Sequence, residues 1–310
     1  MPMVVIGNIF VDIKGFPDGI YIPGGRNAGR METVHGGVGR NVVEDIANIE
    51  LRPVFVSLAD DDESGDAVIR KLKRHRINTD YIVRKPNGNG KWLAIFDHTG
   101  DVVASISVRP DMSGLPELLE EKGDEIFAGC DSIVVEIDME KEVIRQVFRF
   151  AEKYGKKVFA VVANMAIAIE RRDYLKKIEC FVCNIQEAGQ LFLADFSDLS
   201  PEAMARELAE RVKNAGFHSM VVTMGAQGSV YADREGNCGV CPAHKVQVCD
   251  TTGAGDAFCA GVAIGLTYGK TLPQAAEIGT RLSASVITQM ENVCPRFQPR
   301  ELGLDIDVED

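Results

Sequence analysis

Short apolar runs alternate along the chain with stretches in which apolar residues recur every three or four positions. The short runs are typical of buried strands, and the longer periodic stretches are typical of amphipathic helices. The strands predicted in this way are Met3–Ile6, Val54–Leu58, Ser132–Ile137, Val158–Val162, Cys180–Asn184 and Met220–Thr223. The predicted helices are Arg40–Ile49, Ser64–Arg74, Glu142–Tyr154, Glu187–Leu193, Pro201–Asn214 and Leu272–Gln289. This alternation predicts an α/β fold in which helical layers cover a mainly parallel central sheet.

Two regions break the alternation. Residues 14–35 are Gly-rich and extended, and residues 81–108 contain two strand-like segments joined by a hairpin turn at His98–Asp101. Neither region is followed by a helix. Both predict a small β-sheet that projects as a lid from a single domain covering residues 1–310. A cover of this kind excludes water from reactive phosphates.

Composition and charge limit the kind of protein. The chain has 310 residues, of which 45% are hydrophobic, so it can bury the core of one large domain. Its net charge of −12 argues against binding to nucleic acid, which needs a basic face. No apolar run approaches the roughly 18 residues of a membrane span, and the first residues lack the pattern of a signal peptide. These features predict a cytoplasmic protein.

Two Cys-x-x-Cys pairs raise the question of structural zinc. Cys180 and Cys183 lie in a predicted strand, where alternation directs them to opposite faces. Cys238 and Cys241 lie in a turn-rich segment too distant in sequence for finger-like spacing. We therefore interpret them as reduced structural thiols, with a zinc site as the alternative.

The stretch DTTGAGDAFCAG, residues 250–261, carries the strongest chemical signal. A strand-like run, Lys245–Cys249, precedes it, and a predicted helix, Ala257–Leu266, follows. Small residues at such a corner let backbone N–H groups approach a ligand, and the helix N-terminus favours an anion. Asp256 would lie beside that anion. The alternative is that Asp256 merely caps the first helical turn.

Polar residues and glycines also follow the other predicted strands. Open α/β sheets bind ligands at the carboxyl ends of their strands. The residues at these ends are Asp12, the GGVGRN segment at 36–41, Asn184 and Glu187, and the segment Thr223–Ser229. Structural alternatives exist for each: a turn residue for Asp12, a helix-face amide for Asn41, a strand-end cap for Asn184 and a first-turn acid for Glu187.

Two rival phosphate-binding motifs can be set aside. GLTYGKT, residues 265–271, has one residue fewer between its glycines than a P-loop requires, and it ends a helix. Gly37-x-Gly39 begins a dinucleotide fingerprint, but Val42 occupies the position of the third glycine.

Together, GGVGRN, Asn184-x-x-Glu187 and DTTGAGDAFCAG resemble the ribokinase (phosphofructokinase B type) family of sugar and nucleoside kinases. The resemblance covers nearly the whole chain and implies a ribokinase-like fold. It implies an ATP-dependent kinase that phosphorylates a primary hydroxyl of a sugar or nucleoside. In this family, the residue at Asp256 is the catalytic base, and Gly253, Ala254 and Gly255 hold the phosphate, as phosphoryl transfer requires.

The resemblance implies roles for further residues. It places Asp12, Gly37, Arg40 and Asn41 at the substrate. Asn184 and Glu187 would order magnesium through water, which suits an ion that dehydrates reluctantly. Thr223, Gly225 and Gly228 would follow the ATP phosphates, with Asn292 near the adenine. Asp250 and Thr252 match positions that hold a monovalent cation, K⁺, in potassium-activated members.

The sequence departs from the ribokinase pattern at two positions. Phe10 replaces an Asn that is usual two residues before the substrate Asp, and Arg40 replaces a small residue. The GGVGRN spelling resembles the pseudouridine kinases, so the 5′-hydroxyl of pseudouridine is the predicted acceptor. The alternatives are another kinase of this fold, acting on ribose, fructose or another nucleoside, and a catalytically silent sugar-binding regulator. A lid with open strand edges also invites pairing into a homodimer.

Overall fold

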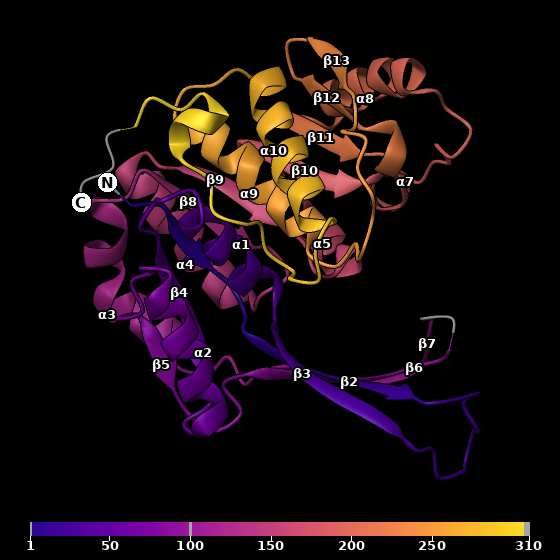
Figure 1. Cartoon of the computed structure of the whole chain (residues 1–310). Coiled ribbons are helices and arrows are strands. Elements are labelled where there is room, and N and C mark those ends of the chain that lie inside the picture. Colours follow the sequence, from indigo (N-terminus) through magenta and orange to yellow (C-terminus); the bar gives the residue numbers. More distant parts are fainter. Residues whose placement is uncertain (1, 99–100, 307–310) are drawn as a thin grey trace.

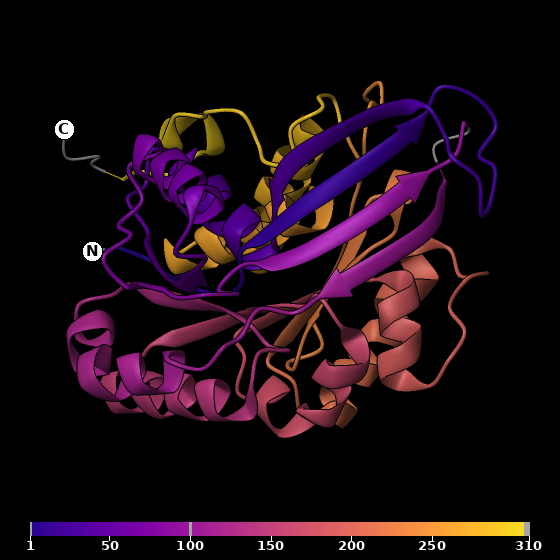
Figure 2. The same cartoon turned by 90° about the horizontal axis from the view of Figure 1, so that it is seen from below.

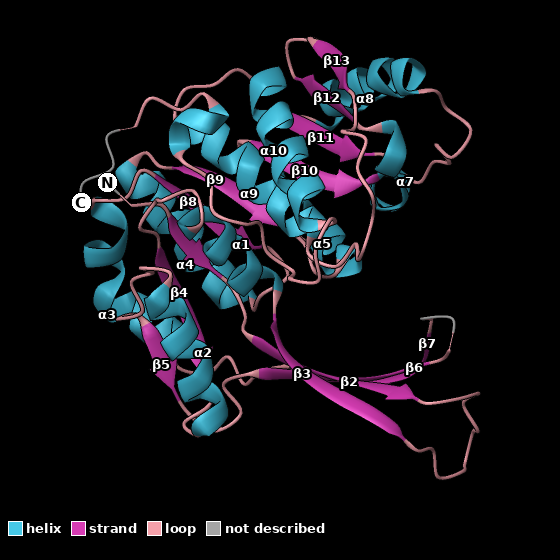
Figure 3. Cartoon of the chain, viewed as in Figure 1, coloured by secondary structure: helices cyan, strands magenta, loops and turns pink. Residues whose placement is uncertain are grey.

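The computed structural model describes residues 2–98 and 101–306, which form an α/β body and a small sheet that extends from it (Figures 1 and 3). The large sheet contains β1 (Val4–Ile6), β4 (Val54–Ala59), β5 (Ile82–Arg84), β8 (Ser132–Glu136), β9 (Lys157–Val161), β10 (Cys180–Asn184), β11 (Ser219–Thr223), β12 (Ser229–Asp233) and β13 (Cys238–Cys241). The small sheet contains β2 (Phe10–Pro17), β3 (Gly29–Gly36), β6 (Gly90–Phe96) and β7 (Val102–Val108).

The strand order of the large sheet is β13-β12-β11-β10-β9-β8-β1-β4-β5. β1 lies between β8 and β4 and pairs in parallel with both. Only β12 runs against the others, because it forms antiparallel pairs with β11 and β13. The mainly parallel sheet is therefore confirmed, and the carboxyl ends of its parallel strands lie along one edge.

Two helical layers cover the large sheet. The helices are α1 (Val38–Ala47), α2 (Glu63–Arg74), α3 (Leu115–Ala128), α4 (Lys141–Tyr154), α5 (Met165–Glu170), α6 (Arg172–Leu175), α7 (Ile185–Phe192), α8 (Pro201–Ala215), α9 (Ala254–Thr267) and α10 (Leu272–Val286). The buried apolar residues of α1, α2, α9 and α10 form one core cluster, and those of α3 to α8 form the other. Cys180 belongs to the first cluster and Cys183 to the second, so they lie on opposite faces as predicted.

The small sheet has the order β3-β2-β6-β7 and extends away from the body below α5 in Figure 1. Seen from below, it crosses in front of the body (Figure 2). β2 begins at Phe10 and β3 ends at Gly36, so the strands reach beyond the predicted bounds of 14–35. Ile82–Arg84 pairs with β4 and belongs to the large sheet instead. The predicted turn at His98–Asp101 includes Thr99 and Gly100, which lie outside the described residues.

The small sheet has two chemically different faces, which its register defines. Asp12 pairs with Trp92, and Lys14 pairs with Ala94, so these side chains share one face. We call this the site face, because it carries Asp12, which the sequence predicts to bind the substrate. The opposite face, called the outer face, carries Val11, Ile13, Met31, Leu93, Ile95, Ala104, Ile106 and Val108.

Three local predictions need correction. Lys245–Cys249 is not a strand: its alternating valines, Val246 and Val248, are exposed, and the segment pairs with no strand of the described chain. Cys238–Cys241 is strand β13 and not a turn, because it forms an antiparallel pair with β12. Helix α3 was missed. Ser200 caps α8: its Oγ accepts the Ala203 N–H at 3.3 Å, and Pro201 follows.

Among the described residues, no helix is both long and apolar enough to cross a bilayer.

Candidate active site

The corner between residues 250 and 256 opens α9 at the edge formed by the strand ends. Gly253 precedes the helix with a φ of 81°, and a side chain there would collide with the Asn292 carbonyl. Gly255 is exposed, and a Cβ added to it would have no protein atom within 4 Å. The first backbone N–H groups of a helix lack intrahelical partners and carry a partial positive charge. The backbone at Gly253, Ala254 and Gly255 can therefore approach an anion.

Asp256 lies in the first turn of α9, beside this anion-binding corner. Asn41 of α1 donates its Nδ2–H to Asp256 Oδ2 at 2.6 Å, which joins residues 215 positions apart. Burial raises the pKa of Asp256 to about 6, against the opposing effects of the Asn41 hydrogen bond and the Arg40 charge. A carboxylate with a pKa near neutrality can accept a proton efficiently. The structure thus places a carboxylate with a raised pKa next to the N-terminus of α9.

Asp12 lies on the site face where β2 leaves the body. Its carboxylate fills the space that a side chain at Gly36 would occupy. Burial raises the pKa of Asp12, opposed by the charges of Lys14 and Arg40. Gly37, with a φ of 99°, packs its backbone against the Asn8 carbonyl and leaves no room for a Cβ. Asp12, Gly37 and Asn41 therefore meet where the small sheet joins α1.

Arg40 is buried behind the residues predicted to bind the substrate, and Asn292 lies beside it. The Arg40 side chain is fully buried, forms an ion pair with Glu44 at 3.1 Å and donates to the His35 and Gly36 carbonyls. Asn292 Nδ2 donates to the His35 carbonyl at 3.2 Å, and its Oδ1 accepts from Arg40. Arg40 thus stabilises the junction of β3 and α1 and is not exposed to solvent. The Asn292 carbonyl packs against Gly253.

Asn184 and Glu187 lie together at the end of β10. They form a reciprocal cap of α7: Glu187 N donates to Asn184 Oδ1 at 2.9 Å, and Asn184 N donates to Glu187 Oε2 at 2.8 Å. Burial raises the pKa of Glu187. The structural alternatives were a strand-end cap for Asn184 and a first-turn acid for Glu187, and the observed cap leaves Glu187 Oε1 able to accept a hydrogen bond.

Thr223 ends β11 directly beside Asn184 of β10. It is followed by a short 3₁₀ turn, Gly225–Gln227, that leads into β12. Gly225 and Gly228 have φ values of 58° and 92°, which favour glycine. A side chain at Gly228 would also collide with the Cys241 carbonyl. The predicted nucleotide loop is thus a tight turn at the same edge of the sheet.

Asp250 and Thr252 interact with each other. Asp250 Oδ1 accepts from Thr252 N at 2.9 Å and from Thr252 Oγ1 at 2.8 Å. This local turn fixes the entry to the corner. No cluster of three or more His, Cys, Asp or Glu suited to a metal ion occurs within residues 2–98 and 101–306. A cation here would have to bind mainly through backbone oxygens and water.

A pair of acids at the end of β8 was not predicted from the sequence. Glu136 is buried and accepts from Asn8 N at 2.8 Å and Asn8 Nδ2 at 2.9 Å. Burial, together with the nearby Asp138, raises the pKa of Glu136. Asp138 Oδ1 accepts from Ala163 N at 3.0 Å. Their place at the carboxyl end of a central strand was the signal that could have revealed them.

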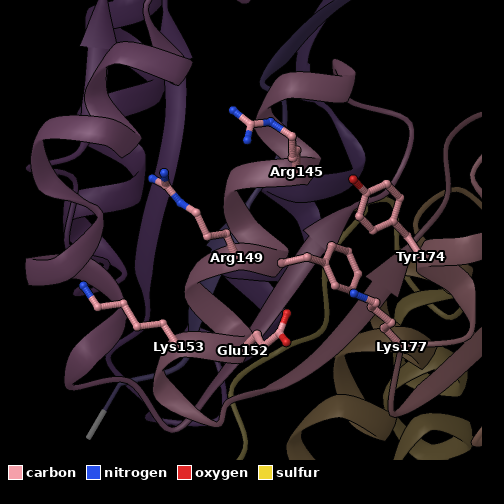
Figure 4. Close-up of a pocket in the computed structure, with 7 residues that line it drawn as sticks. Arg145, Arg149, Glu152, Lys153, Tyr174 and Lys177 are labelled. Carbon is pink, nitrogen blue, oxygen red and sulfur yellow. The ribbon is translucent and has the colours of Figure 1, made fainter.

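Surface hollows occur away from this edge. One of about 430 Å³ lies between α4 and α6 (Figure 4). Three of its basic residues, Arg145, Arg149 and Lys153, already form ion pairs with Glu142, Glu120 and Asp124. Another, of about 410 Å³, lies beside α7. Neither is lined by the residues of the corner.

An acid beside a helix N-terminus, at the strand ends of an α/β body with a projecting small sheet, is an arrangement that suits phosphoryl transfer. The model of the pfkB family of carbohydrate kinases matches residues 2–294. The chain therefore belongs to the pfkB carbohydrate kinase family. It is an enzyme that transfers a phosphoryl group to a sugar or nucleoside hydroxyl.

Individual relatives show how the chain is placed within this family. It is 32% identical to the guanosine-inosine kinase of Exiguobacterium acetylicum, covering 94% of this chain and 95% of the relative. It is 26% identical to the pseudouridine kinase of Escherichia coli strain K12, with 84% and 82% coverage. The structure of Arabidopsis thaliana ribokinase complexed with ribose and ATP is similar with a TM-score of 0.85, 21% identity and 97% and 98% coverage. This likeness confirms the ribokinase-like fold.

Proposed function

We propose that the protein transfers the γ-phosphoryl group of ATP to the 5′-hydroxyl of a nucleoside. The observation that carries the proposal is the Asn41–Asp256 hydrogen bond of 2.6 Å beside the N-terminus of α9. Asp256 would remove the proton of the attacking hydroxyl. The backbone at Gly253, Ala254 and Gly255 would stabilise the negative charge of the transferring group.

The remaining residues would bind the two substrates. Asp12, Gly37 and Asn41 lie together where ribose hydroxyls could reach both a carboxylate and an amide. Thr223, Gly225 and Gly228 would follow the ATP phosphates. Glu187 could hold magnesium through water by its Oε1, and magnesium would neutralise charge on the phosphates. Potassium at Asp250 and Thr252 would order the corner.

A purine ribonucleoside is the favoured acceptor. The guanosine-inosine kinase is 32% identical over nearly the whole chain, whereas the pseudouridine kinase is 26% identical over a smaller share. Pseudouridine stays a second candidate because of the GGVGRN spelling at 36–41. Guanosine, inosine and pseudouridine all present the same ribose 5′-hydroxyl, so proton transfer to Asp256 does not distinguish them.

A substrate screen tests this proposal. We expect kcat/KM for guanosine or inosine to exceed that for ribose and fructose by at least about tenfold, because a free sugar leaves base-binding contacts unmade. ADP release would be measured for guanosine, inosine, pseudouridine, ribose and fructose at matched concentrations. Efficient phosphorylation of ribose or fructose, with none of the nucleosides accepted, would refute the nucleoside proposal while leaving the kinase class intact.

A substitution at Gly255 tests the anion site separately from folding. We expect Gly255→Val to lower kcat/KM for ATP at least about tenfold, the effect of roughly 1.4 kcal/mol of lost transition-state binding. The valine side chain would enter open space where the phosphate should lie, so the melting temperature should change little. Gly129→Val is the matched control, since Gly129 also has no atom near its Cβ but lies at the end of α3. Wild-type kinetics for Gly255→Val would contradict the assignment of the phosphate site to this corner.

The outer face of the small sheet supports the proposal of a homodimer. Met31, Leu93, Ile106 and Val108 are all exposed on it, with Met31 at 79% and Ile106 at 64%. An apolar face of this kind is unfavourable in water unless it is covered. We expect sedimentation equilibrium to give the mass of two chains, and Ile106→Lys to give the mass of one. A monomeric wild-type protein at micromolar concentration would contradict this.

A further inference from the structure

The site face of the small sheet carries a row of aromatic residues next to Asp12. They are Phe10 and Phe16 of β2 and Trp92 and Phe96 of β6. The Phe10 ring lies over Gly90, its partner in the register, because a Cβ at Gly90 would collide with that ring. Phe16 and Phe96 stack with their centroids 4.9 Å apart. The row therefore begins beside the substrate carboxylate and runs outward along the sheet.

Trp92 is the member of this row closest to Asp12 in the register. The two residues are direct partners in parallel strands, which lie about 4.8 Å apart, and their side chains point to the same face. Trp92 is half-buried, and Phe96 packs against it edge-on, with centroids 6.4 Å apart and planes at 87°. The indole is thus supported by the sheet while part of its surface stays accessible.

This arrangement matches the dimensions of a nucleoside. A base is attached directly to the ribose, so a ribose whose hydroxyls bind Asp12 would carry its base to an adjacent side chain of the same face. The adjacent side chain in β6 is an indole, which offers a flat apolar surface to any purine or pyrimidine. A polar residue would suffice at this position for a free sugar.

We propose that Trp92 is the residue on which the nucleobase stacks and that it selects nucleosides over free sugars. This inference rests on the proposed nucleoside kinase function and names the residue that sets its specificity. Stacking of a base on an aromatic side chain contributes roughly 10- to 100-fold in affinity. Trp92 touches no reacting atom, so its contribution belongs to substrate binding and not to the proton transfer at Asp256.

The chain provides its own probe, because Trp92 is its single tryptophan. We expect the indole fluorescence of the wild-type protein to change on titration with inosine, guanosine or pseudouridine, and to saturate at the affinity measured by calorimetry. Ribose should leave the emission unchanged, because it does not reach the indole. Calorimetric binding of a nucleoside without any change in Trp92 emission would overturn the inference.

Kinetics of Trp92 variants give a second, independent readout. We expect Trp92→Leu to raise KM for the accepted nucleoside about 10- to 100-fold and to leave KM for ATP within about twofold. Trp92→Phe should recover most of the loss, because a phenyl ring still stacks. Tyr154→Leu, a change of the same kind at an aromatic residue of α4, is the matched control and should leave both KM values unchanged.

These experiments distinguish a failure of the role of Trp92 from a failure of the proposed nucleoside kinase function. Phosphorylation of a nucleoside with KM unchanged in Trp92→Leu overturns the role of Trp92 and leaves the proposed function standing. Phosphorylation of free sugars alone overturns the proposed function itself. If Trp92→Leu fails to fold, the fluorescence titration of the wild-type protein with nucleosides still tests whether the base stacks on Trp92.

Discussion

Asp256→Asn is expected to lower kcat by about 10²–10⁴ while ATP binding and the fold are retained. The asparagine has the shape of the aspartate and can still accept the hydrogen bond from Asn41 Nδ2, so packing at the start of α9 is preserved. It cannot take a proton from the attacking hydroxyl. Steady-state kinetics and a thermal melt would separate the two effects. Asp173→Asn, the same change at an exposed carboxylate of α6, is the control.

The pH profile of the wild-type enzyme provides a further check on Asp256. Its pKa in the folded protein is raised to about 6, so the base is deprotonated above this pH and protonated below it. We therefore expect kcat/KM to be retained at pH 7 to 8 and to fall as the pH drops through about 6. Turnover of Asp256→Asn within a few-fold of wild type would remove Asp256 from the role of base.

Arg40→Met is expected to lower the free energy of unfolding by about 3–5 kcal/mol, because it leaves the carboxylate of Glu44 buried without its main partner. Both side chains are fully buried, and Arg40 Nη1 lies 3.1 Å from Glu44 Oε2. Lys71, 3.2 Å from the same oxygen, would remain. Although burial opposes it, the positive charges of Arg40 and Lys71 hold the pKa of Glu44 below its usual value.

Urea unfolding followed by circular dichroism measures this loss. Arg145→Met is the control, since it removes an exposed ion pair with Glu142 on α4 and should change stability little. Adding Glu44→Gln to Arg40→Met should restore part of the stability, because the buried charge that Lys71 alone would have to compensate is gone. An Arg40→Met protein as stable as wild type, with a raised KM for the nucleoside, would return Arg40 to the substrate site.

The parallel core of the fold was predictable because its strands are buried on both faces. β4, β8 and β10 read as continuous apolar runs that no helix or turn pattern resembles. β3 gave no such signal, since most of its residues are exposed and it is defined by pairing with β2. Lys245–Cys249 shows the reverse error: it has the alternation of a strand but no sheet edge to pair with. Strand formation at an edge depends on a partner that local sequence does not reveal.

The sequence of α3 only weakly favours a helix, and packing against α4 stabilises it. Its apolar face is interrupted by Gly123, which the sequence alone favours as a break. The structure shows the reason for the glycine: the Phe150 ring of α4 lies where its side chain would be. The low helix propensity of Gly123 disfavours α3, and the packing of Phe150 against Gly123 stabilises it.

The candidate site was predictable where the chemistry is local and not where it depends on long-range contacts. The corner at Gly253–Asp256 could be read from one short stretch, because glycines, a helix start and an acid occur together. The hydrogen bond from Asn41 joins two helices far apart in sequence and needed the fold. Arginine is usually exposed, so the sequence did not predict that Arg40 is buried. Its role follows from the buried ion pair with Glu44 in the structure.

The position of the new phosphate in the product tests the central claim most directly. The protein would be incubated with ATP, magnesium and inosine, and the phosphorus NMR spectrum of the nucleotide product recorded with proton coupling. If Asp256 activates the 5′-hydroxyl, the phosphorus couples to the two hydrogens of the 5′-carbon and gives a triplet. A doublet, which marks a phosphate on the 2′- or 3′-oxygen, or the absence of any phosphorylated nucleoside with guanosine and pseudouridine also tried, would contradict it.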